Sequence, residues 1–163
     1  MSALELAPYL LGKILCVKGE DGSVTKGRIN ETEAYYGEED TACHAHKGRT
    51  PRTEVLYEQG GVAYVYLCYG MHNLMNVISG PEGHPEGVLI RGISGFSGPG
   101  KLTKYLSINR SFNREDFLTS ERIWLEDDGF VPEDIYTTPR IGINYATQEY
   151  IDIPWRFLYK EKP

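Results

Sequence analysis

The sequence has few cysteines, no long apolar run and no excess of positive charge. Its three cysteines, Cys16, Cys43 and Cys68, are an odd number without paired spacing, which favours reduced thiols over the disulfide framework of a small secreted protein. No apolar stretch reaches the roughly 18 residues that cross a bilayer, and no basic leader precedes the first leucines, so we expect a cytoplasmic protein without a membrane segment. The 9 prolines and 18 glycines are too scattered for a collagen-like or low-complexity chain.

The chain is acidic, with 17 Lys and Arg residues against 23 Asp and Glu residues and a net charge of −6. This balance argues against a broad basic surface, so a polyanionic partner would have to bind a local patch. Part of the acidic excess lies in Asp127, Asp128, Glu133 and Asp134. We expect this segment to form a solvated surface loop.

The 163 residues suit a single domain, because no internal repeat or linker interrupts residues 1–163. A capping serine, Ser2, and a stop at Gly12 predict an opening helix between them. Strand-like runs cover five segments: Lys13–Lys18, Lys26–Tyr36, Val62–Tyr69, Leu74–Ser79 and Val88–Ile93. The links between most of them are too short for parallel crossovers, which favours antiparallel pairing, and Lys101–Leu106 predicts a second helix. The predicted fold class is therefore α+β.

Two carboxylates lie two residues apart in the strand-like run 27–37. In an extended chain successive side chains alternate, so this pattern predicts one shared face for a set of four residues: Ile29, Glu31, Glu33 and Tyr35. Partial burial beside Ile29 and Tyr35 would make Glu31 or Glu33 a candidate acid or base. Ordinary salt bridges on a solvent-exposed face are the alternative.

Two histidines follow, His44 and His46. On an extended segment both imidazoles point the same way, as ligands of a divalent metal do, and Asp40, Glu31 and Glu33 could complete such a site. A second matched pair of ligands is missing from the pattern, so loop histidines that stack or hydrogen-bond are the commoner interpretation.

A local basic patch precedes a strand with an unusual end. Lys47, Arg49 and Arg52 lie together in a loop that could bind phosphates. The following strand ends in a turn that places Tyr69 and Met71 at a hairpin tip. An aromatic ring and a methionine at an exposed tip could insert between stacked bases, or they could pack on a neighbouring loop.

The segment Gly95–Lys101 is similar to a phosphate-binding loop between a strand and a helix. However, Leu102 stands where such a loop needs Ser or Thr for magnesium, and Pro99 removes a backbone N–H donor. We therefore do not expect a nucleoside triphosphate site, although Lys101 could still contact a DNA phosphate.

Several motifs combine into one pattern over nearly the whole chain, from Leu6 to Tyr159. The chain carries, in order, ETEAY (31–35), RTPR (49–52), YVY (64–66), YGM (69–71), Asn76, VLIR (88–91), GPGKL (98–102) and PWRF (154–157). In order and approximate spacing these motifs resemble the alkyladenine DNA glycosylase family, also called 3-methyladenine DNA glycosylases. The resemblance implies a curved, mostly antiparallel sheet, like an open barrel or roll, flanked by short helices and carrying a protruding β-hairpin.

The resemblance also implies an activity on double-stranded DNA. Such an enzyme extrudes a damaged purine (3-methyladenine, 7-methylguanine, hypoxanthine or ethenoadenine) and hydrolyses its N-glycosidic bond to leave an abasic site. By position, Glu33 resembles the general base that activates water, and Arg91 resembles its partner. Ile141 resembles the residue whose main-chain carbonyl also meets that water.

The resemblance assigns further residues to base binding and DNA contact. Tyr35, His44 and Tyr66 resemble the aromatic side chains that stack on the extruded base. Asn76 resembles the residue that rejects the 2-amino group of guanine, and Leu89 belongs to the same pocket. Tyr69, with Met71, resembles the group that fills the hole in the duplex. The candidate phosphate contacts are Lys47, Arg49, Arg52, Lys101 and Lys104.

No lysine in the matched motifs is placed as a Schiff-base nucleophile, so we expect hydrolysis without strand cleavage. We expect no cofactor, no metal, no membrane and no obligate protein partner, and a cytoplasmic location at the nucleoid. Two alternatives stay open. One is a metal-dependent hydrolase that uses His44, His46 and Glu33, and the other is a DNA-lesion binder without catalysis.

Overall fold

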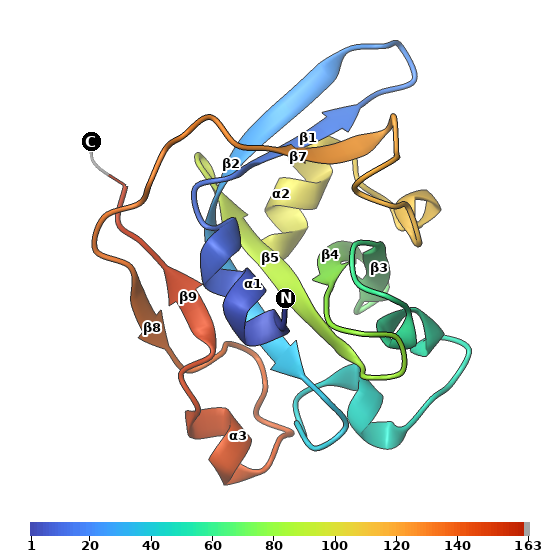
Figure 1. Cartoon of the computed structure of the whole chain (residues 1–163), viewed down its shortest axis with the longest axis vertical. Helices are drawn as coiled ribbons and strands as arrows, with labels where there is room; N and C mark the ends of the chain where they lie inside the picture. The colour runs from blue at the N-terminus through green and yellow to red at the C-terminus, as the bar shows by residue number, and fades with distance from the viewer. Residues whose placement is uncertain (162–163) are drawn as a thin grey trace.

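The computed structural model describes residues 1–161, and a curled antiparallel sheet forms most of it (Figure 1). Residues 162 and 163, which the single domain predicted for 1–163 includes, lie outside the described residues. In order of pairing the strands are β3 (Ala63–Cys68), β4 (His72–Ile78), β5 (Glu86–Ile93), β2 (Val24–Tyr36), β1 (Ile14–Lys18) and β7 (Ile123–Glu126). Three short strands join this path: β6 (Phe96–Ser97) pairs with β5, β9 (Arg156–Leu158) pairs with β2, and β8 (Tyr136–Thr138) pairs with β9. The predicted α+β class with a curved antiparallel sheet is confirmed.

Short helices flank the sheet. They are α1 (Ala3–Leu10), α2 (Pro99–Leu106) and α3 (Gln148–Asp152), with single 3₁₀ turns η1 (His44–Lys47), η2 (Glu54–Tyr57) and η3 (Arg110–Phe112). The helix α1 begins as predicted, because Ser2 Oγ accepts a hydrogen bond from the Glu5 N–H at 3.2 Å. The helix α2 begins at Pro99, earlier than predicted, because the fixed φ of proline suits the first helical position. Among the described residues no helix is long and apolar enough to cross a membrane.

All five predicted strands are present, and their ends differ from the predicted ends by at most two residues. Strands β7, β8 and β9 were not predicted, because three or four residues are too few for an alternating pattern. The acidic segment between β7 and β8 is an exposed loop, as expected. Two of its carboxylates are nevertheless paired: Asp127 lies 3.3 Å from Lys13 Nζ, and Asp128 lies 2.6 Å from Arg28 Nη2.

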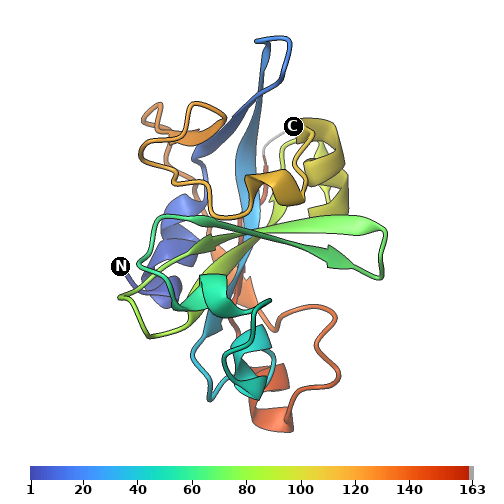
Figure 2. The same cartoon turned by 90° about the vertical axis from the view of Figure 1, so that its right-hand side faces the viewer.

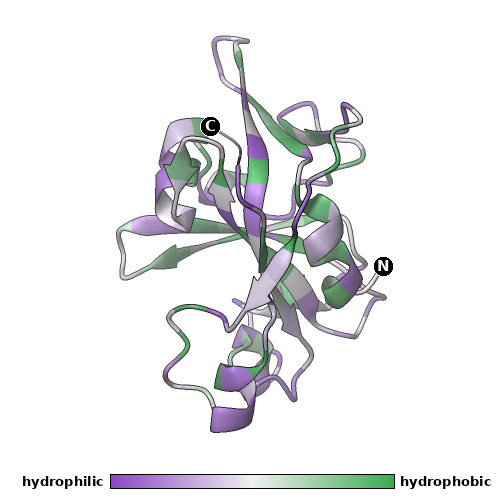
Figure 3. Ribbon diagram, turned by 90° about the vertical axis from the view of Figure 1, so that its left-hand side faces the viewer, coloured by the Kyte–Doolittle hydropathy of each residue, from purple (hydrophilic) through white to green (hydrophobic). Residues whose placement is uncertain are grey.

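One large hydrophobic core lies between the concave sheet and the helices α1 and α2. It takes side chains from both helices and from β1 to β5, among them Leu10, Leu102, Met75 and Ile90. Figure 3 shows hydrophobic and hydrophilic residues alternating along the long strands, as a half-buried sheet requires. The face of the sheet away from this core carries a smaller aromatic cluster and the candidate site.

The pairing of β2 with β5 is irregular beside the site. The opposed residues are Ile29 and Ile93, Glu31 and Gly92, then Thr32 and Ile90, so Asn30 in β2 and Arg91 in β5 have no opposite residue. Such bulges change which face of the sheet a side chain reaches. The predicted shared face of Ile29 and Glu33 is therefore wrong: Ile29 is fully buried in the large core, whereas Glu33 faces the site.

The hairpin of β3 and β4 extends beyond the rest of the sheet (Figure 2). Its turn has positive φ angles at Tyr69 (+52°) and Gly70 (+66°), and the Met71 N–H donates to the Cys68 carbonyl at 3.1 Å. Two consecutive positive φ angles match the twist of a hairpin, but they strain a residue that has a Cβ atom. The protruding hairpin is confirmed, and Tyr69 holds a strained backbone at its tip.

Candidate active site

Glu33 lies in β2 with its side chain fully buried, and two donors hold its carboxylate. The Tyr35 hydroxyl donates to Oε1 at 2.9 Å, and the Ile141 backbone N–H donates to Oε2 at 2.7 Å. Arg91 Nη1 lies 3.8 Å from Oε1. Tyr35 reaches Glu33 because side chains two residues apart on a strand share a face. The donation from Ile141 N–H was not expected from the sequence, which pointed to its carbonyl.

Glu31 orients the arginine that lies beside Glu33. Its Oε2 accepts hydrogen bonds from Arg91 Nε at 3.1 Å and from Arg156 Nε at 2.7 Å. Glu31 and Glu33 therefore face one guanidinium, and the predicted pairing of the two carboxylates on one face is confirmed. The alternative of exposed salt bridges is wrong for Glu33, because its side chain is fully buried.

A second ion pair lies next to the site, between Arg140 and Asp40, and both side chains are fully buried. The guanidinium donates to the two Asp40 oxygens at 2.6 and 2.9 Å, and its centre lies 4.8 Å from the centroid of the Tyr35 ring. Because Arg140 directly precedes Ile141, the pair fixes the backbone N–H that reaches Glu33. No pattern in the sequence pointed to Arg140, since its partner is 100 positions away.

Burial raises the pKa of Glu33 above its ordinary value of 4.5, because desolvation disfavours the charged carboxylate. Arg91, the Ile141 N–H and the Tyr35 hydroxyl lower the pKa and so offset part of that effect. Burial also raises the pKa of Tyr35 well above 10, so its hydroxyl remains a hydrogen-bond donor at neutral pH. A held carboxylate with a raised pKa is suited to accept a proton from water.

Strand pairing places a row of side chains next to Glu33. Glu33 is opposite Leu89 in β5, Leu89 is opposite Asn76 in β4, and Asn76 is opposite Tyr64 in β3. Directly opposed residues of antiparallel strands share a face, so the row forms one surface. Asn76 is fixed in it because its Nδ2 donates to the Tyr64 carbonyl at 3.2 Å.

Aromatic side chains enclose a cavity of about 40 Å³ over this row, lined among others by Tyr35, His44, Tyr64, Tyr66, Asn76 and Tyr145. The His44 ring meets Tyr66 edge-on at 4.5 Å between centroids, and its Nδ1 lies 3.1 Å from Tyr64 Oη. Burial, aided by the nearby charge of Arg52, lowers the pKa of His44 to about 4, so the imidazole is neutral at pH 7. The four aromatic and amide residues predicted for a base pocket (Tyr35, His44, Tyr66 and Asn76) therefore lie together.

A groove of about 490 Å³ adjoins the cavity and leads from it toward the hairpin tip. It contains the other predicted site residues Leu89, Arg91, Ile141, Tyr69 and Lys101. Tyr69 is 92% exposed and Met71 is 73% exposed, so neither packs on a neighbouring loop. Tyr145 lines both hollows, with its hydroxyl donating to the Ala42 carbonyl at 2.9 Å, and no pattern in the sequence pointed to it.

The predicted phosphate contacts are not equivalent. Lys101 lines the groove, Lys47 lines a neighbouring hollow with His44, and Lys104 is exposed on α2. Arg52 is exposed, and its guanidinium lies 5.5 Å from the centroid of the Tyr66 ring. Arg49 differs, because Glu54 binds its guanidinium at 2.7 and 2.8 Å and neutralises it locally.

The two histidines do not form the arrangement that the metal alternative needs. They lie in the 3₁₀ turn η1 rather than in an extended segment, so the prediction that both imidazoles point the same way is wrong. His44 Nδ1 faces Tyr64, whereas His46 Nδ1 lies 2.8 Å from the Glu38 carbonyl. Asp40 is bound to Arg140. In residues 1–161 no three His, Cys, Asp or Glu side chains cluster as a metal site would require.

Comparison with known proteins gives one consistent result. The profile of the family described as methylpurine-DNA glycosylase matches residues 1–97 and 94–163. A protein of Psychrobacter cryohalolentis is 44% identical over 170 residues, covering 86% of this chain and 80% of the relative. A protein of Methanocella arvoryzae is 43% identical, covering 98% of this chain and 88% of the relative. A protein of Borrelia garinii subsp. bavariensis is 40% identical, covering 98% of this chain and 91% of the relative. All three bear the provisional name 3-methyladenine DNA glycosylase.

Proposed function

Because the chain belongs to the methylpurine-DNA glycosylase family, and is therefore a DNA repair hydrolase, we propose that it excises alkylated and deaminated purines from duplex DNA. The substrates are 3-methyladenine, 7-methylguanine, hypoxanthine and ethenoadenine. The product is an abasic site in an uncleaved strand. The glycosylase domain spans residues 1–163. The enzyme acts at the nucleoid in the cytoplasm.

The observation that carries the mechanism is the position of Glu33, which is fully buried and held by two donors, one of which, Tyr35, lines the aromatic cavity. In its ionised form it accepts a proton from water as that water attacks C1′ of the nucleotide. Departure of the base leaves a sugar with oxocarbenium character, and the Glu33 charge stabilises it. Arg91 lowers the pKa of Glu33, which favours the ionised carboxylate, and orients the water.

The aromatic cavity selects bases by stacking and by shape. Extrusion of a nucleotide costs a few kcal/mol, and least for damaged or mispaired bases. Stacking on Tyr35, His44 and Tyr66 returns about 1–3 kcal/mol per base. Asn76, whose amide donates to the Tyr64 carbonyl, disfavours normal guanine by a clash with its 2-amino group. 7-Methylguanine has the same group but is cationic, so its base leaves readily. His44 is neutral, so a purine made cationic by alkylation meets no positive imidazole.

The cavity of about 40 Å³ is far smaller than the adjoining groove of about 490 Å³. A purine therefore enters through the adjoining groove, and Tyr145, which is 68% exposed and lines both hollows, moves to admit it. A purine made cationic by alkylation leaves as a neutral base, because it takes the electron pair of the glycosidic bond, and it needs no proton. Neutral hypoxanthine or ethenoadenine needs a proton, and none of the buried groups of the site is an obvious donor.

Tyr69 fills the space that the extruded nucleotide leaves, with Met71 beside it. Four exposed cations contact DNA phosphates: Lys47, Arg52, Lys101 and Lys104. Arg49 contacts a phosphate only where that phosphate replaces Glu54. Because the net charge is −6 and these contacts are few, we expect modest affinity for undamaged DNA that falls as salt rises.

A single-turnover assay tests the proposal. Duplexes carrying one hypoxanthine or one ethenoadenine, and methylated DNA for release of 3-methyladenine, are incubated with wild type, Glu33→Gln and the exposed control Glu20→Gln. We expect base release by wild type and Glu20→Gln, and a loss of about 100-fold or more in Glu33→Gln with damaged duplex still bound. Binding without base release in the wild type would reduce the function to lesion recognition.

A further inference from the structure

A separate hollow lies at the opposite side of the molecule from the β3–β4 hairpin, and no step of base excision uses it. Its volume is about 460 Å³. Four segments form it: Arg28 in β2, Ser94 after β5, the loop between β7 and β8, and the residues that follow β9. Figure 1 places β8 and β9 at the left and the hairpin at the right of the same view.

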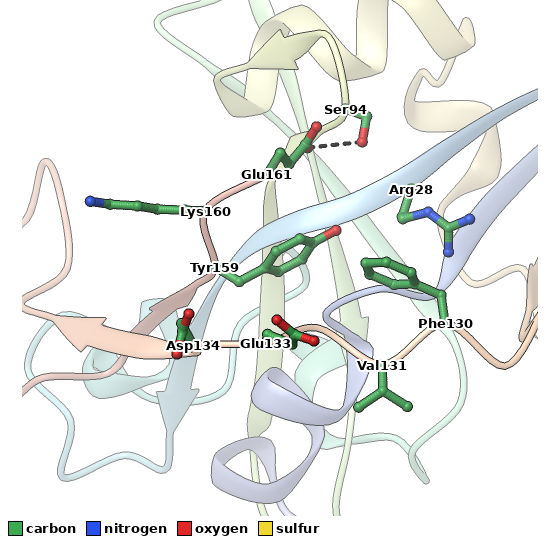
Figure 4. A pocket seen from close by; sticks show the side chains of 9 residues that line it. All are labelled: Arg28, Ser94, Phe130, Val131, Glu133, Asp134, Tyr159, Lys160 and Glu161. Carbon is green, nitrogen blue, oxygen red and sulfur yellow. Dashed lines mark hydrogen bonds between the residues drawn. The ribbon is translucent and has the colours of Figure 1, made fainter. Parts of the chain in front are cut away.

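The first observation that points to a ligand is the Tyr159 hydroxyl. Tyr159 is only 7% exposed, and its hydroxyl oxygen is buried without a hydrogen-bond partner. Buried polar atoms without a partner are rare in proteins, because their desolvation is not compensated. Figure 4 shows this hydroxyl directed toward the space between Ser94 and Arg28, within the hollow.

The second observation is the charge around the hollow. Arg28 is already paired, because it donates to both Asp128 oxygens at 3.0 and 2.6 Å and to the Gly12 carbonyl at 2.8 Å. The ammonium of Lys160 points away from the other lining side chains (Figure 4). The rim carries three carboxylates, Glu133, Asp134 and Glu161.

The third observation is the aromatic floor. The rings of Phe130 and Tyr159 lie 6.0 Å apart between centroids and are inclined by 46°. Phe130 remains 42% exposed although Arg28 lies 4.6 Å from its centroid. Aromatic faces next to carboxylates attract organic cations, because both the ring quadrupole and the negative charge favour them.

We propose that this hollow binds an organic cation, a primary ammonium or guanidinium group on a short aliphatic stem. Tyr159 Oη accepts one N–H of the cation, Asp134 and Glu161 bind its charge, and the rings of Phe130 and Tyr159 cover the stem. The cation is either a free di- or polyamine or a Lys or Arg side chain of a protein partner. The site is independent of the base-excision proposal, because it shares no residue with the groove or the cavity.

Isothermal titration calorimetry of the full chain tests this site with two probes, 1,4-diaminobutane and N-acetyl-arginine amide, at constant ionic strength. The variants are Tyr159→Phe and Asp134→Asn. Asparagine tolerates the positive φ of +54° at position 134, and phenylalanine removes only the unpartnered oxygen, so both variants keep the fold. Glu20→Gln is the control, because it removes one exposed charge in the β1–β2 turn.

We expect saturable binding to the wild type and to Glu20→Gln. In each pocket variant we expect Kd to rise by about fivefold or more, because one hydrogen bond or charge contact is lost. Binding of the diamine identifies a free cation as ligand, and binding of the arginine amide alone identifies a partner's side chain. The proposal is overturned if neither probe binds at about 10 mM, or if both pocket variants bind as the wild type does.

Discussion

The backbone N–H of Ile141 donates a hydrogen bond of 2.7 Å to Glu33 Oε2, although 108 positions separate the two residues. The N–H is held in place by the preceding residue, Arg140, whose guanidinium is paired with the buried carboxylate of Asp40. The orientation of the candidate catalytic carboxylate thus depends on a fully buried ion pair. We therefore expect stability and the placement of Glu33 to be coupled through this pair.

Asp40→Ala leaves the buried Arg140 without its partner. We expect the free energy of unfolding to fall by about 3–5 kcal/mol, the typical cost of removing one member of a buried pair. Urea denaturation measures it, and Asp21→Ala, an exposed carboxylate, is the control. The double variant Asp40→Leu/Arg140→Met should recover much of the loss, since it leaves no buried charge. A loss below about 1 kcal/mol in the single variant would contradict the role of the pair.

Glu33→Gln should stabilise the protein at neutral pH. The pKa of Glu33 is above 4.5 in the folded state. At pH values between 4.5 and this raised pKa, the folded chain holds a proton that the unfolded chain has released. The wild type therefore loses stability, relative to the variant, as pH rises above about 4.5 through the raised pKa. Thermal denaturation of both proteins between pH 4 and 8 measures the difference. We expect the difference in stability between the two proteins to disappear below pH 4.5. A difference that does not depend on pH would argue against the raised pKa.

His44 should remain neutral throughout the physiological range, because burial lowers its pKa to about 4. Heteronuclear NMR of the imidazole carbons, assigned with His44→Asn, should show no titration of His44 between pH 5.5 and 8. Arg52→Ala removes the charge that adds to this lowering, so the pKa of His44 should rise in that variant. Titration of His44 near its ordinary value of 6.5 in the wild type would contradict the burial of the ring.

Tyr69→Asn should separate stability from function at the hairpin tip. Tyr69 has a φ of +52° and is 92% exposed, so its ring contributes little to packing. Asparagine adopts this conformation more readily, and we expect the free energy of unfolding to rise by up to about 1 kcal/mol. Single-turnover base excision should fall about tenfold or more if the ring fills the vacated space in the duplex. Unchanged excision would remove Tyr69 from the proposed mechanism.

Much of the fold could be predicted because the relevant signals are local. Ser2 caps α1, Tyr69 and Gly70 mark the hairpin turn, and alternating patterns locate β1 to β5 within two residues. The short strands β7 to β9 carry too few residues for a pattern. They depend on neighbours already in place, as β9 depends on β2. The shared face of Ile29 and Glu33 was predicted wrongly, because a bulge is a property of two paired strands.

The sequence by itself determined the residue types of the site: the carboxylates of β2, the aromatic residues, Asn76, Arg91 and the exposed tip. Only the tertiary structure decided how they work together. Strand pairing places Asn76 and Leu89 beside Glu33, and the Asp40–Arg140 pair brings the Ile141 N–H to its carboxylate. The tertiary structure also leaves the Tyr159 hydroxyl buried without a hydrogen-bond partner. Side-chain chemistry is encoded residue by residue, whereas burial and electrostatic partners arise only when segments far apart in the chain exclude water from each other.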